Sequence, residues 1–179
     1  MILEFNQFYI NKIQEKDAWE ICEFVVSNQD RLKRYFPITL AENLTPTLSK
    51  LFTEKQILKF QNKEEFIFPI KEKETNVLVG LVFIRELDWD KKQGEFGYCI
   101  DETFKGKKII TQAVQLLSEY AFKQLDLKTL QILVYKDNTS SIEVAKNNGF
   151  EWVKTLKKEF TPTGESPLDL ELYKLTYKA

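Results

Sequence analysis

The segment from residue 94 to residue 135 constrains the fold most, because the spacing of its apolar residues changes twice. Residues 94–100 (GEFGYCI) are typical of a strand, residues 108–124 repeat apolar side chains at helical spacing, and residues 130–135 (LQILVY) form a continuous apolar run. Such a run is typical of a strand covered on both faces. A strand, a helix and a strand in this order form a βαβ unit. We therefore expect strands 94–100 and 130–135 to be parallel neighbours or near-neighbours.

The other apolar patterns predict further strands and helices around this unit. The expected strands are residues 8–13, 66–70, 76–87, 150–160 and 168–177, and the expected helices are residues 14–28, 47–61 and 140–148. Residues 31–46 are expected to be irregular, because Pro37 and Pro46 interrupt them. The sequence thus predicts one α/β domain over residues 1–179, with a mixed, mostly antiparallel central sheet of about seven strands and flanking helices.

The ends and faces of these helices carry recognisable signals. Asp17 is the expected N-cap of helix 14–28, Ser140 and Glu143 have capping-box spacing, and Gly149 is the expected left-handed residue after helix 140–148. The residues expected to face the core are Trp19, Ile21, Cys22, Val25 and Val26 in the first helix, Leu48, Leu51, Phe52, Ile57 and Leu58 in the second, and Ile110, Ala113, Val114, Leu117, Tyr120 and Ala121 in helix 108–124.

The composition excludes several kinds of site. The formal net charge is −1, from 26 Lys and Arg against 27 Asp and Glu, so the chain has no overall basic field that would attract nucleic acid. It contains no histidine, which rules out Ser-His-Asp and Cys-His catalysis and most zinc sites. Cys22 and Cys99 match no metal-binding spacing, and we expect no metal. The chemistry must therefore use carboxylates, hydroxyls, backbone amides or a cofactor.

The sequence also indicates a cellular compartment. Residues 2–10 (ILEFNQFYI) mix polar and apolar side chains and lack the basic lead and cleavage site of a signal peptide. No apolar run approaches the roughly 20 residues that span a membrane. The two cysteines read as reduced thiols. We expect a cytoplasmic protein that does not associate with membranes.

A cluster of lysines precedes helix 108–124. Lys105, Lys107 and Lys108 flank Gly106 between the carboxyl end of one expected strand and the amino end of the helix. The first N–H groups of a helix have no partner within it, and the helix dipole adds positive charge there. The glycine allows the backbone to approach a ligand closely. These features predict an anion site, most naturally for a pyrophosphate. The alternative is a set of solvated lysines that serves only solubility, as at many helix ends.

Two motifs relate this loop to a known family. GEFGYCID runs into the loop, and DNTSSIEVAKNNGF follows the next strand. The arrangement resembles the GNAT superfamily of acyl-CoA-dependent N-acyltransferases, and most of all its RimJ/RimL-type branch. The resemblance is specific between Glu95 and Phe150. It implies a GNAT-like fold and an enzyme that transfers an acetyl group from acetyl-CoA to a primary amine, by direct attack in a ternary complex.

The resemblance also implies which residues bind acetyl-CoA. In the family pattern Gln/Arg-x-x-Gly-x-Gly/Ala, Lys105 replaces the first residue, Lys108 the glycine and Ile110 the small residue. The Lys108 side chain would either narrow the phosphate cradle or help to neutralise the phosphates. The residues expected to contact acetyl-CoA are Tyr98, Cys99, Ile100, Lys105, Gly106, Lys107, Lys108, Ile109, Ile110, Thr111, Asn138 and Ser141.

The second motif, Asn-x-x-Ser…Gly-Phe, is matched more closely. The resemblance places Asn138 beside the cofactor arm, whereas its simplest alternative is a turn residue. Gly149 and Phe150 are expected to end the helix and make a hydrophobic contact. Many relatives carry a tyrosine acid where Ala145 stands, so Ser141 is the expected hydrogen-bond donor to the departing sulfur. Its alternative is an ordinary serine in the first turn of a helix.

The general base must be a carboxylate, and Glu95 is the expected one. Several relatives use a glutamate at this position, and a buried glutamate with a raised pKa would suit the role. The alternative is a solvated charge on a strand. Backbone N–H groups near Gly97 and Tyr98 are expected to polarise the thioester carbonyl.

The acceptor is expected to be a primary amine on a protein N-terminus or a small molecule. Its binding should involve the N-terminal helices and residues 31–44, although Arg31, Arg34, Tyr35 and Phe36 could equally be surface or core residues. A homodimer is possible by resemblance. A catalytically weak CoA-binding sensor or interaction protein is the alternative function. A nucleotide-triphosphate site ranks last, because the P-loop pattern is missing.

Overall fold

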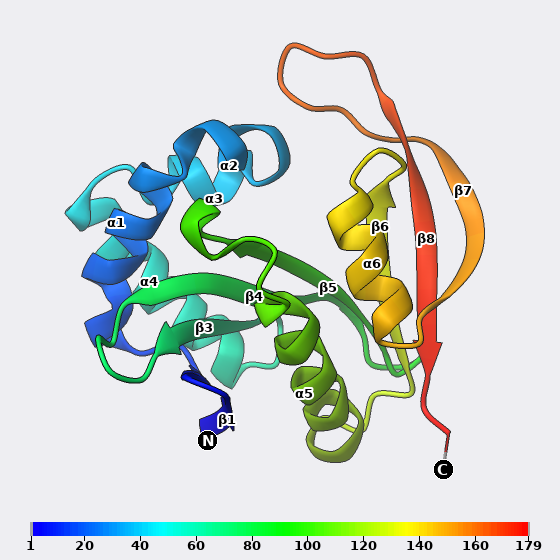
Figure 1. Cartoon of the computed structure of the whole chain (residues 1–179), viewed down its shortest axis with the longest axis horizontal. Helices are drawn as coiled ribbons and strands as arrows, with labels where there is room; N and C mark the ends of the chain where they lie inside the picture. The colour runs from blue at the N-terminus through cyan, green and yellow to red at the C-terminus, as the bar shows by residue number, and fades with distance from the viewer. Residues whose placement is uncertain (1, 179) are drawn as a thin grey trace. The chain divides into compact units, whose positions relative to one another are not determined.

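The computed structural model describes residues 2–178, which form an α/β fold with a mixed sheet of eight strands in the order β1-β2-β3-β4-β5-β6-β8-β7 (Figure 1). The strands are β1 (Ile2–Phe5), β2 (Phe8–Asn11), β3 (Phe66–Glu72), β4 (Leu78–Asp88), β5 (Gln93–Ile100), β6 (Thr129–Tyr135), β7 (Glu151–Phe160) and β8 (Leu168–Thr176). The α-helices are α1 (Ala18–Ser27), α2 (Gln29–Tyr35), α3 (Pro37–Ala41), α4 (Pro46–Gln61), α5 (Ile109–Gln124) and α6 (Thr139–Asn147).

Contacts within the chain divide it into two compact units. The first unit contains the described residues up to Phe83 together with Tyr98–Lys105. The second contains Ile84–Gly97 and the described residues from Gly106 onward. Strands β4 and β5 continue from one unit into the other, so each unit is described below by itself.

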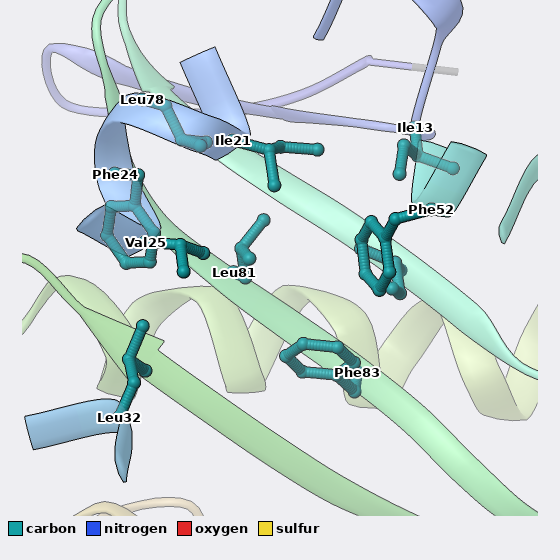
Figure 2. Packing of buried hydrophobic residues seen from close by; sticks show 10 residues of the cluster. Ile13, Ile21, Phe24, Val25, Leu32, Phe52, Leu78, Leu81 and Phe83 are labelled. Carbon is teal, nitrogen blue, oxygen red and sulfur yellow. The ribbon is translucent and has the colours of Figure 1, made fainter. Parts of the chain in front are cut away.

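The core of the first unit lies under α1 and α4 (Figure 2). β2 pairs antiparallel with both β1 and β3, for example at Leu3–Ile10 and Ile10–Ile70. Aromatic side chains fill much of this core, and the Phe36 ring stacks on the Phe83 ring with centroids 5.6 Å apart. The buried cluster comprises Ile13, Ile21, Phe24, Val25, Leu32, Phe52, Ile67, Leu78, Leu81 and Phe83.

The predicted faces of the N-terminal helices are only partly correct. Ile21, Cys22 and Val25 of α1 are buried as expected, but Trp19 and Val26 are exposed. In α4 only Phe52 of the five expected residues is fully buried, and Leu51 and Leu58 are 57% and 59% exposed. Polar residues face inward instead, namely Ser49, Thr53 and Gln56. The apolar residues of α4 are spread around the helix, so its sequence does not define the buried face.

Two further sequence expectations are wrong in this unit. Residues 31–46 are largely helical, because Pro37 lies at the first position of α3, where a helix tolerates proline. Asp17 makes no side-chain cap on α1. Its Oδ2 instead accepts a hydrogen bond from the Gln14 N–H, and its Oδ1 pairs with the buried Lys71 ammonium at 2.7 Å. Lys71 also pairs with Glu20 at 2.7 Å, so the buried lysine has two carboxylate partners.

The second unit contains the predicted βαβ connection. β5 and β6 are parallel, with register from Gln93–Thr129 to Phe96–Ile132, which confirms the predicted pairing. Residues on one face of β6 are buried, whereas those on the other face are half-buried, so the prediction of two covered faces is right for one face only. The C-terminal β8 pairs antiparallel with both β6 and β7 and therefore lies between them. α5 buries the predicted residues except Tyr120, which is half-buried.

Candidate active site

The lysine loop ends at an uncapped helix N-terminus. Lys108 is the N-cap of α5, but its side chain makes no capping hydrogen bond and the first turn contains no acidic residue. The Gln112 N–H donates to the Lys108 carbonyl in the first helical hydrogen bond. The N–H groups of Ile109, Ile110 and Thr111 precede that bond and have no partner within the helix. The local chain thus presents backbone donors and lysine charge together.

The backbone of this loop is left-handed at two positions. Gly106 has φ +78°, and a Cβ added there would meet no atom within 4 Å, so the space around it is open. Lys108 has φ +57°, a conformation that costs a non-glycine residue about 1 kcal/mol or more. Lys108 therefore adopts a left-handed conformation that glycine would adopt without strain.

The second motif begins α6. Asn138 is the N-cap of this helix, and its Oδ1 accepts a hydrogen bond from the Ser141 N–H at 3.2 Å. The predicted capping box of Ser140 and Glu143 is wrong, because the helix begins one residue before Ser140 and Asn138 takes the capping position. Asn138 is thus at least a helix cap. Ser141 lies half-buried in the first turn.

The end of α6 also matches its sequence signals. Gly149 has φ +75° and follows the helix, as predicted. The Phe150 ring is buried and meets the Phe96 ring of β5 edge-on, with centroids 6.3 Å apart. This contact confirms that Gly149 and Phe150 end the helix and anchor it.

One link between the two helices was not anticipated. The Asn148 side chain donates through Nδ2 to the Thr111 carbonyl at 3.1 Å and to the Val144 carbonyl at 2.9 Å. It thereby joins the end of α6 to the first turn of α5, which lie side by side in Figure 1. The repeated asparagines before Gly149 were the only sequence signal for this contact.

Glu95 is buried on β5 and pairs with Arg85 of β4. Arg85 donates through Nε and Nη2 to the same carboxylate oxygen, Oε1, at 3.2 Å and 3.1 Å. Burial raises the pKa of Glu95 above its ordinary value of 4.5, and Arg85 opposes this shift. Glu86 and Glu159 raise the pKa further. The alternative of a solvated charge on a strand is therefore wrong. The partner Arg85 was missed because it lies ten residues away across a strand connection.

The end of β5 belongs to the first unit, where Tyr98, Cys99 and Ile100 are half-buried. Burial raises the pKa of the Cys99 thiol to about 12, so this thiol is protonated at neutral pH. A Cβ added at Gly80 of β4 would lie 2.8 Å from the Cys99 carbonyl oxygen. Gly80 therefore lets β4 approach the backbone of β5 closely.

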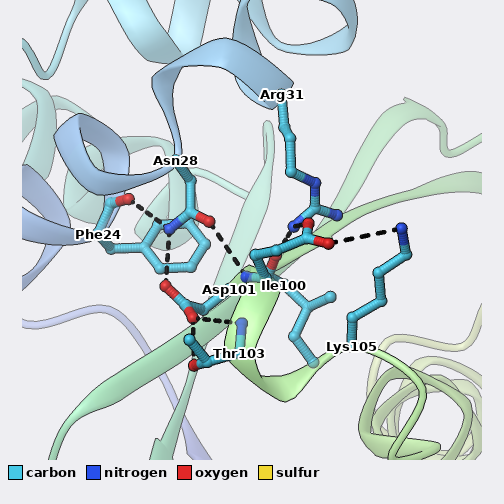
Figure 3. Close-up of polar contacts among 8 residues, drawn as sticks. Phe24, Asn28, Arg31, Ile100, Asp101, Thr103 and Lys105 are labelled. Atoms are coloured by element: carbon cyan, nitrogen blue, oxygen red, sulfur yellow. Dashed lines mark hydrogen bonds and ion pairs between the residues drawn. The ribbon is translucent and has the colours of Figure 1, made fainter.

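A polar network holds the segment that follows β5 (Figure 3). The Asn28 side chain donates to Asp101 Oδ2 at 2.9 Å and accepts from the Glu102 N–H at 3.2 Å. Arg31 donates to the Ile100 carbonyl at 2.7 Å and pairs with Glu102 at 2.9 Å. Lys105 lies 3.7 Å from the same Glu102 carboxylate. The network connects α1 and α2 with the start of the lysine loop.

The residues considered for acceptor binding have other contacts. Arg31 belongs to the network just described, and Phe36 packs in the core on Phe83. The Arg34 guanidinium lies over the Tyr35 ring, 5.3 Å from its centroid. Arg31, Arg34 and Phe36 thus contact other residues of the first unit, and the partner of Arg34 is Tyr35.

The structure places the predicted site residues in both units. Those of the second unit are Glu95, Gly106, Lys107, Lys108, Ile109, Ile110, Thr111, Asn138 and Ser141, and those of the first are Tyr98, Cys99, Ile100 and Lys105. Within the second unit, the Asn148 bond joins the first turn of α5 to α6, whose other end carries Asn138 and Ser141. The uncapped N-terminus of α5 and the left-handed loop residues can bind an anionic ligand, and Glu95 is a buried carboxylate with a raised pKa.

A family model described as an acetyltransferase (GNAT) domain matches residues 7–151. The chain belongs to the GNAT acetyltransferase family. This acetyltransferase is 30% identical over 143 residues to the YdaF protein of Bacillus subtilis (strain 168), whose name assigns it provisionally as a ribosomal N-acetyltransferase. The match covers 79% of this chain and 76% of that protein. This acetyltransferase is also 31% identical to the spermidine N(1)-acetyltransferase of Escherichia coli (strain K12), over 48% of this chain and 46% of that protein.

Solved structures share the fold of this acetyltransferase. The ribosomal-protein-S5-alanine acetyltransferase from Vibrio fischeri matches with a TM-score of 0.91 and 22% identity, over 98% of this chain and 96% of that one. The microcin C7 self-immunity acetyltransferase MccE, solved with acetyl-CoA and AMP, matches with a TM-score of 0.85 and 26% identity, over 97% and 94% of the two chains. These likenesses confirm the predicted GNAT fold. Among residues 2–178, the acetyltransferase has no helix that is long and apolar enough to cross a membrane.

Proposed function

We propose that this acetyltransferase transfers an acetyl group from acetyl-CoA to a primary amine on a protein N-terminus or a small molecule. The observation that carries the proposal is the N-terminus of α5, which lacks a side-chain cap and follows two left-handed residues, Gly106 and Lys108. A pyrophosphate needs convergent N–H donors and positive charge, and this segment supplies both. The family model spans residues of both compact units, which supports a single catalytic domain over residues 1–179.

The residues of the loop fit the phosphates of acetyl-CoA. The N–H groups of residues 109–111 would donate to phosphate oxygens, while Lys107 and Lys108 would supply charge at the same helix end. The open space around Gly106 allows the backbone to approach a phosphate. Asn138 is proposed to position the cofactor arm in addition to capping α6. Tyr98, Cys99, Ile100 and Lys105 are proposed to bind acetyl-CoA on the family resemblance alone.

Glu95 is proposed as the general base. When bound, acetyl-CoA supplies the thioester carbonyl carbon that the amine attacks. The amine nitrogen forms the new C–N bond, the C–S bond breaks, and the Glu95 carboxylate takes the proton that the amine loses. A raised pKa suits this role, because a carboxylate with a more basic oxygen is the better proton acceptor near neutral pH. The Gly97 N–H is proposed to donate to the carbonyl oxygen as charge develops there.

The departing sulfur needs a proton or a hydrogen bond. Ala145 is fully buried and offers no acid at the position of the family tyrosine. Ser141 is proposed to donate to the sulfur from the first turn of α6. A thiol of this kind has a pKa of about 8–9 by analogy with cysteine, so the thiolate is an adequate leaving group with only a hydrogen-bond donor beside it.

Relatives indicate which amines to test. Their names include a ribosomal-protein-serine acetyltransferase, a ribosomal-protein-S5-alanine acetyltransferase and a spermidine acetyltransferase. We propose that the acceptor of this chain belongs to one of these two classes, a peptide amino terminus or a polyamine. The panel is therefore a peptide beginning with serine, a peptide beginning with alanine, and spermidine.

The first experiment is a calorimetric titration of the purified protein with acetyl-CoA, with ATP and magnesium as the control. Micromolar binding of acetyl-CoA, without binding of ATP, is the expected result. Release of CoA in the presence of the acceptor panel then distinguishes an enzyme from a CoA-binding sensor. Absence of acetyl-CoA binding would contradict the proposed function, and binding without turnover on any amine would favour the sensor.

A further inference from the structure

We propose that Arg85 is a positioning residue for Glu95, which holds one oxygen of the carboxylate so that the other oxygen faces the acceptor amine. This inference rests on the proposed function, because it assumes that Glu95 removes the proton from the amine. It concerns a residue that the sequence did not bring to attention. Four observations on the second unit carry it.

The first observation is how the two side chains meet. Both hydrogen bonds from Arg85, through Nε and Nη2, go to Oε1 of Glu95. In the usual fork-to-fork pairing, a guanidinium uses its two N–H groups on the two different oxygens of a carboxylate. Neither of the two hydrogen bonds from Arg85 engages Oε2 of Glu95. The pairing therefore fixes the carboxylate and leaves one oxygen available for a proton.

The second observation is the unequal exposure of the pair. The Glu95 side chain is 9% exposed, whereas the Arg85 side chain is 39% exposed. A buried carboxylate loses much of its hydration and needs a partner to stay ionised. Arg85 provides that partner and keeps part of its own hydration. Such a pair keeps a buried carboxylate ionised at a lower desolvation cost than a pair in which both charges are fully buried.

The third observation is the glycine beneath the guanidinium. A Cβ added at Gly97 would lie 3.4 Å from both Cζ and Nε of Arg85. That distance is a close van der Waals contact, so the Gly97 backbone lies directly against the guanidinium. Gly97 lies two residues from Glu95 on the same strand, and side chains two residues apart in a strand lie on one face. Arg85 thus lies against both the proposed base and the backbone proposed to polarise the carbonyl.

The fourth observation is the charge around Glu95. Glu86 on β4 and Glu159 on β7 both favour its protonated form, as burial does. Arg85 supplies the opposing influence, through its charge and through its hydrogen bonds. A protonated Glu95 cannot accept the amine proton. Arg85 therefore has two effects on the base: it orients the carboxylate, and it limits how far the pKa of Glu95 rises.

The test compares Arg85→Gln and Arg85→Lys with the wild type over a range of pH. The acceptor is the member of the panel with the highest turnover. Glu95 must be ionised to act, so the acidic limb of the kcat/KM profile reports its pKa. We expect Arg85→Gln to shift this acidic limb to higher pH by about one unit. At pH values where Glu95 is fully ionised, the plateau of the profile, the variant should have a kcat at least about tenfold lower. Arg85→Lys should keep the limb at its wild-type pH, because it keeps the positive charge. Its kcat on the plateau should still be low, because lysine lacks the paired N–H donors of the guanidinium.

Controls separate positioning from loss of structure. Lys123→Gln removes an exposed cation paired with Glu119 on α5 and should change neither limb nor plateau. Acetyl-CoA affinity should be close to the wild-type value in both Arg85 variants, and both should still unfold cooperatively. Arg85→Gln should lower the unfolding midpoint moderately at neutral pH, because the buried Glu95 carboxylate loses its partner, whereas Arg85→Lys should keep most of the stability. A titration of the Glu95 side-chain carboxyl by carbon NMR gives its pKa without any acceptor, and Arg85→Gln should raise it.

The outcomes distinguish failure of this inference from failure of the proposed function. If Glu95→Gln abolishes the acidic limb but Arg85→Gln leaves limb and plateau unchanged, Glu95 is the base and the inference about Arg85 is wrong. If Glu95→Gln leaves the profile unchanged, the general-base role is wrong and the inference fails with it. An unchanged Glu95 titration in Arg85→Gln would also overturn the inference.

Discussion

The Asn28 side chain bridges the end of α1 to the segment after β5: its Nδ2 donates to Asp101 at 2.9 Å, and its Oδ1 accepts from the Glu102 N–H. The same Nδ2 donates to the Phe24 carbonyl of α1 at 2.9 Å. Asn28 is buried, and one amide therefore satisfies a helix end, a carboxylate and a backbone donor. Loss of this buried amide removes three hydrogen bonds, although the Phe24 carbonyl keeps the bond that it accepts from the Asn28 N–H.

We therefore expect Asn28→Ala to lower the free energy of unfolding by about 1–3 kcal/mol, since it removes three hydrogen bonds made by a buried side chain. Urea unfolding followed by circular dichroism measures the change. Asn62→Ala is a matched control, because Asn62 also follows a helix but its side chain bonds only the exposed Glu64. Equal effects of the two variants would contradict the bridging role of Asn28.

The left-handed backbone of Lys108 predicts that glycine stabilises the fold there. Lys108→Gly should raise the free energy of unfolding by about 1 kcal/mol, because glycine adopts this φ without strain. Acetyl-CoA affinity should fall a few-fold, and its dependence on salt should weaken, if the ammonium neutralises phosphate. Lys107→Gly removes the same charge at a residue without a positive φ, and it should not stabilise the fold. Tighter acetyl-CoA binding by Lys108→Gly would show that the lysine narrows the cradle.

Capping and cofactor positioning by Asn138 can be separated. Asn138→Ala should destabilise α6 by about 1 kcal/mol, whereas Asn138→Ser should preserve the cap. If Asn138 also positions the cofactor arm, Asn138→Ser will still raise the KM for acetyl-CoA, because the shorter side chain does not reach as far. Thermal unfolding and steady-state kinetics together give both values. Wild-type kinetics in a stable Asn138→Ser variant would reduce Asn138 to a helix cap.

The raised pKa of Glu95 has a consequence for stability that needs no substrate. The folded protein binds the Glu95 proton more tightly than the unfolded chain, so this group favours folding below the ordinary value of 4.5. That contribution is lost as pH rises from the unfolded to the raised folded pKa. The stability of the wild type relative to Glu95→Gln should therefore fall across this window. Denaturant unfolding of both proteins at several pH values measures it, and a difference that rises with pH would contradict the raised pKa.

The strands and α5 were predictable because their apolar residues keep one period over many positions. The α4 face was not, since its leucines are spread around the helix and Ser49, Thr53 and Gln56 point inward. The expected sheet lacked β1, whose four residues are too short a run to stand out. α3 was missed because a proline that begins a helix looks, in sequence, like one that breaks it.

In the candidate site too, some residues could be predicted from the sequence and others could not. Glu95, the lysine loop and the Asn138 motif could be found from sequence, because each is a local pattern. Arg85 and Asn148 could not, because their partners are brought near only by strand pairing and helix packing. The left-handed conformation of Lys108 was also hidden, since a lysine gives no sign that the backbone requires a positive φ there.

The position of β8 between β6 and β7 affects the order in which the chain can fold during synthesis. β6 and β7 leave the ribosome before β8, yet both pair with β8. The sheet of the second unit therefore cannot be completed until residues 168–176 have emerged. Until then, β7 and the edge of β6 that faces β8 have unpaired backbone N–H and C=O groups. A chaperone or a neighbouring nascent chain can bind these exposed edges during synthesis.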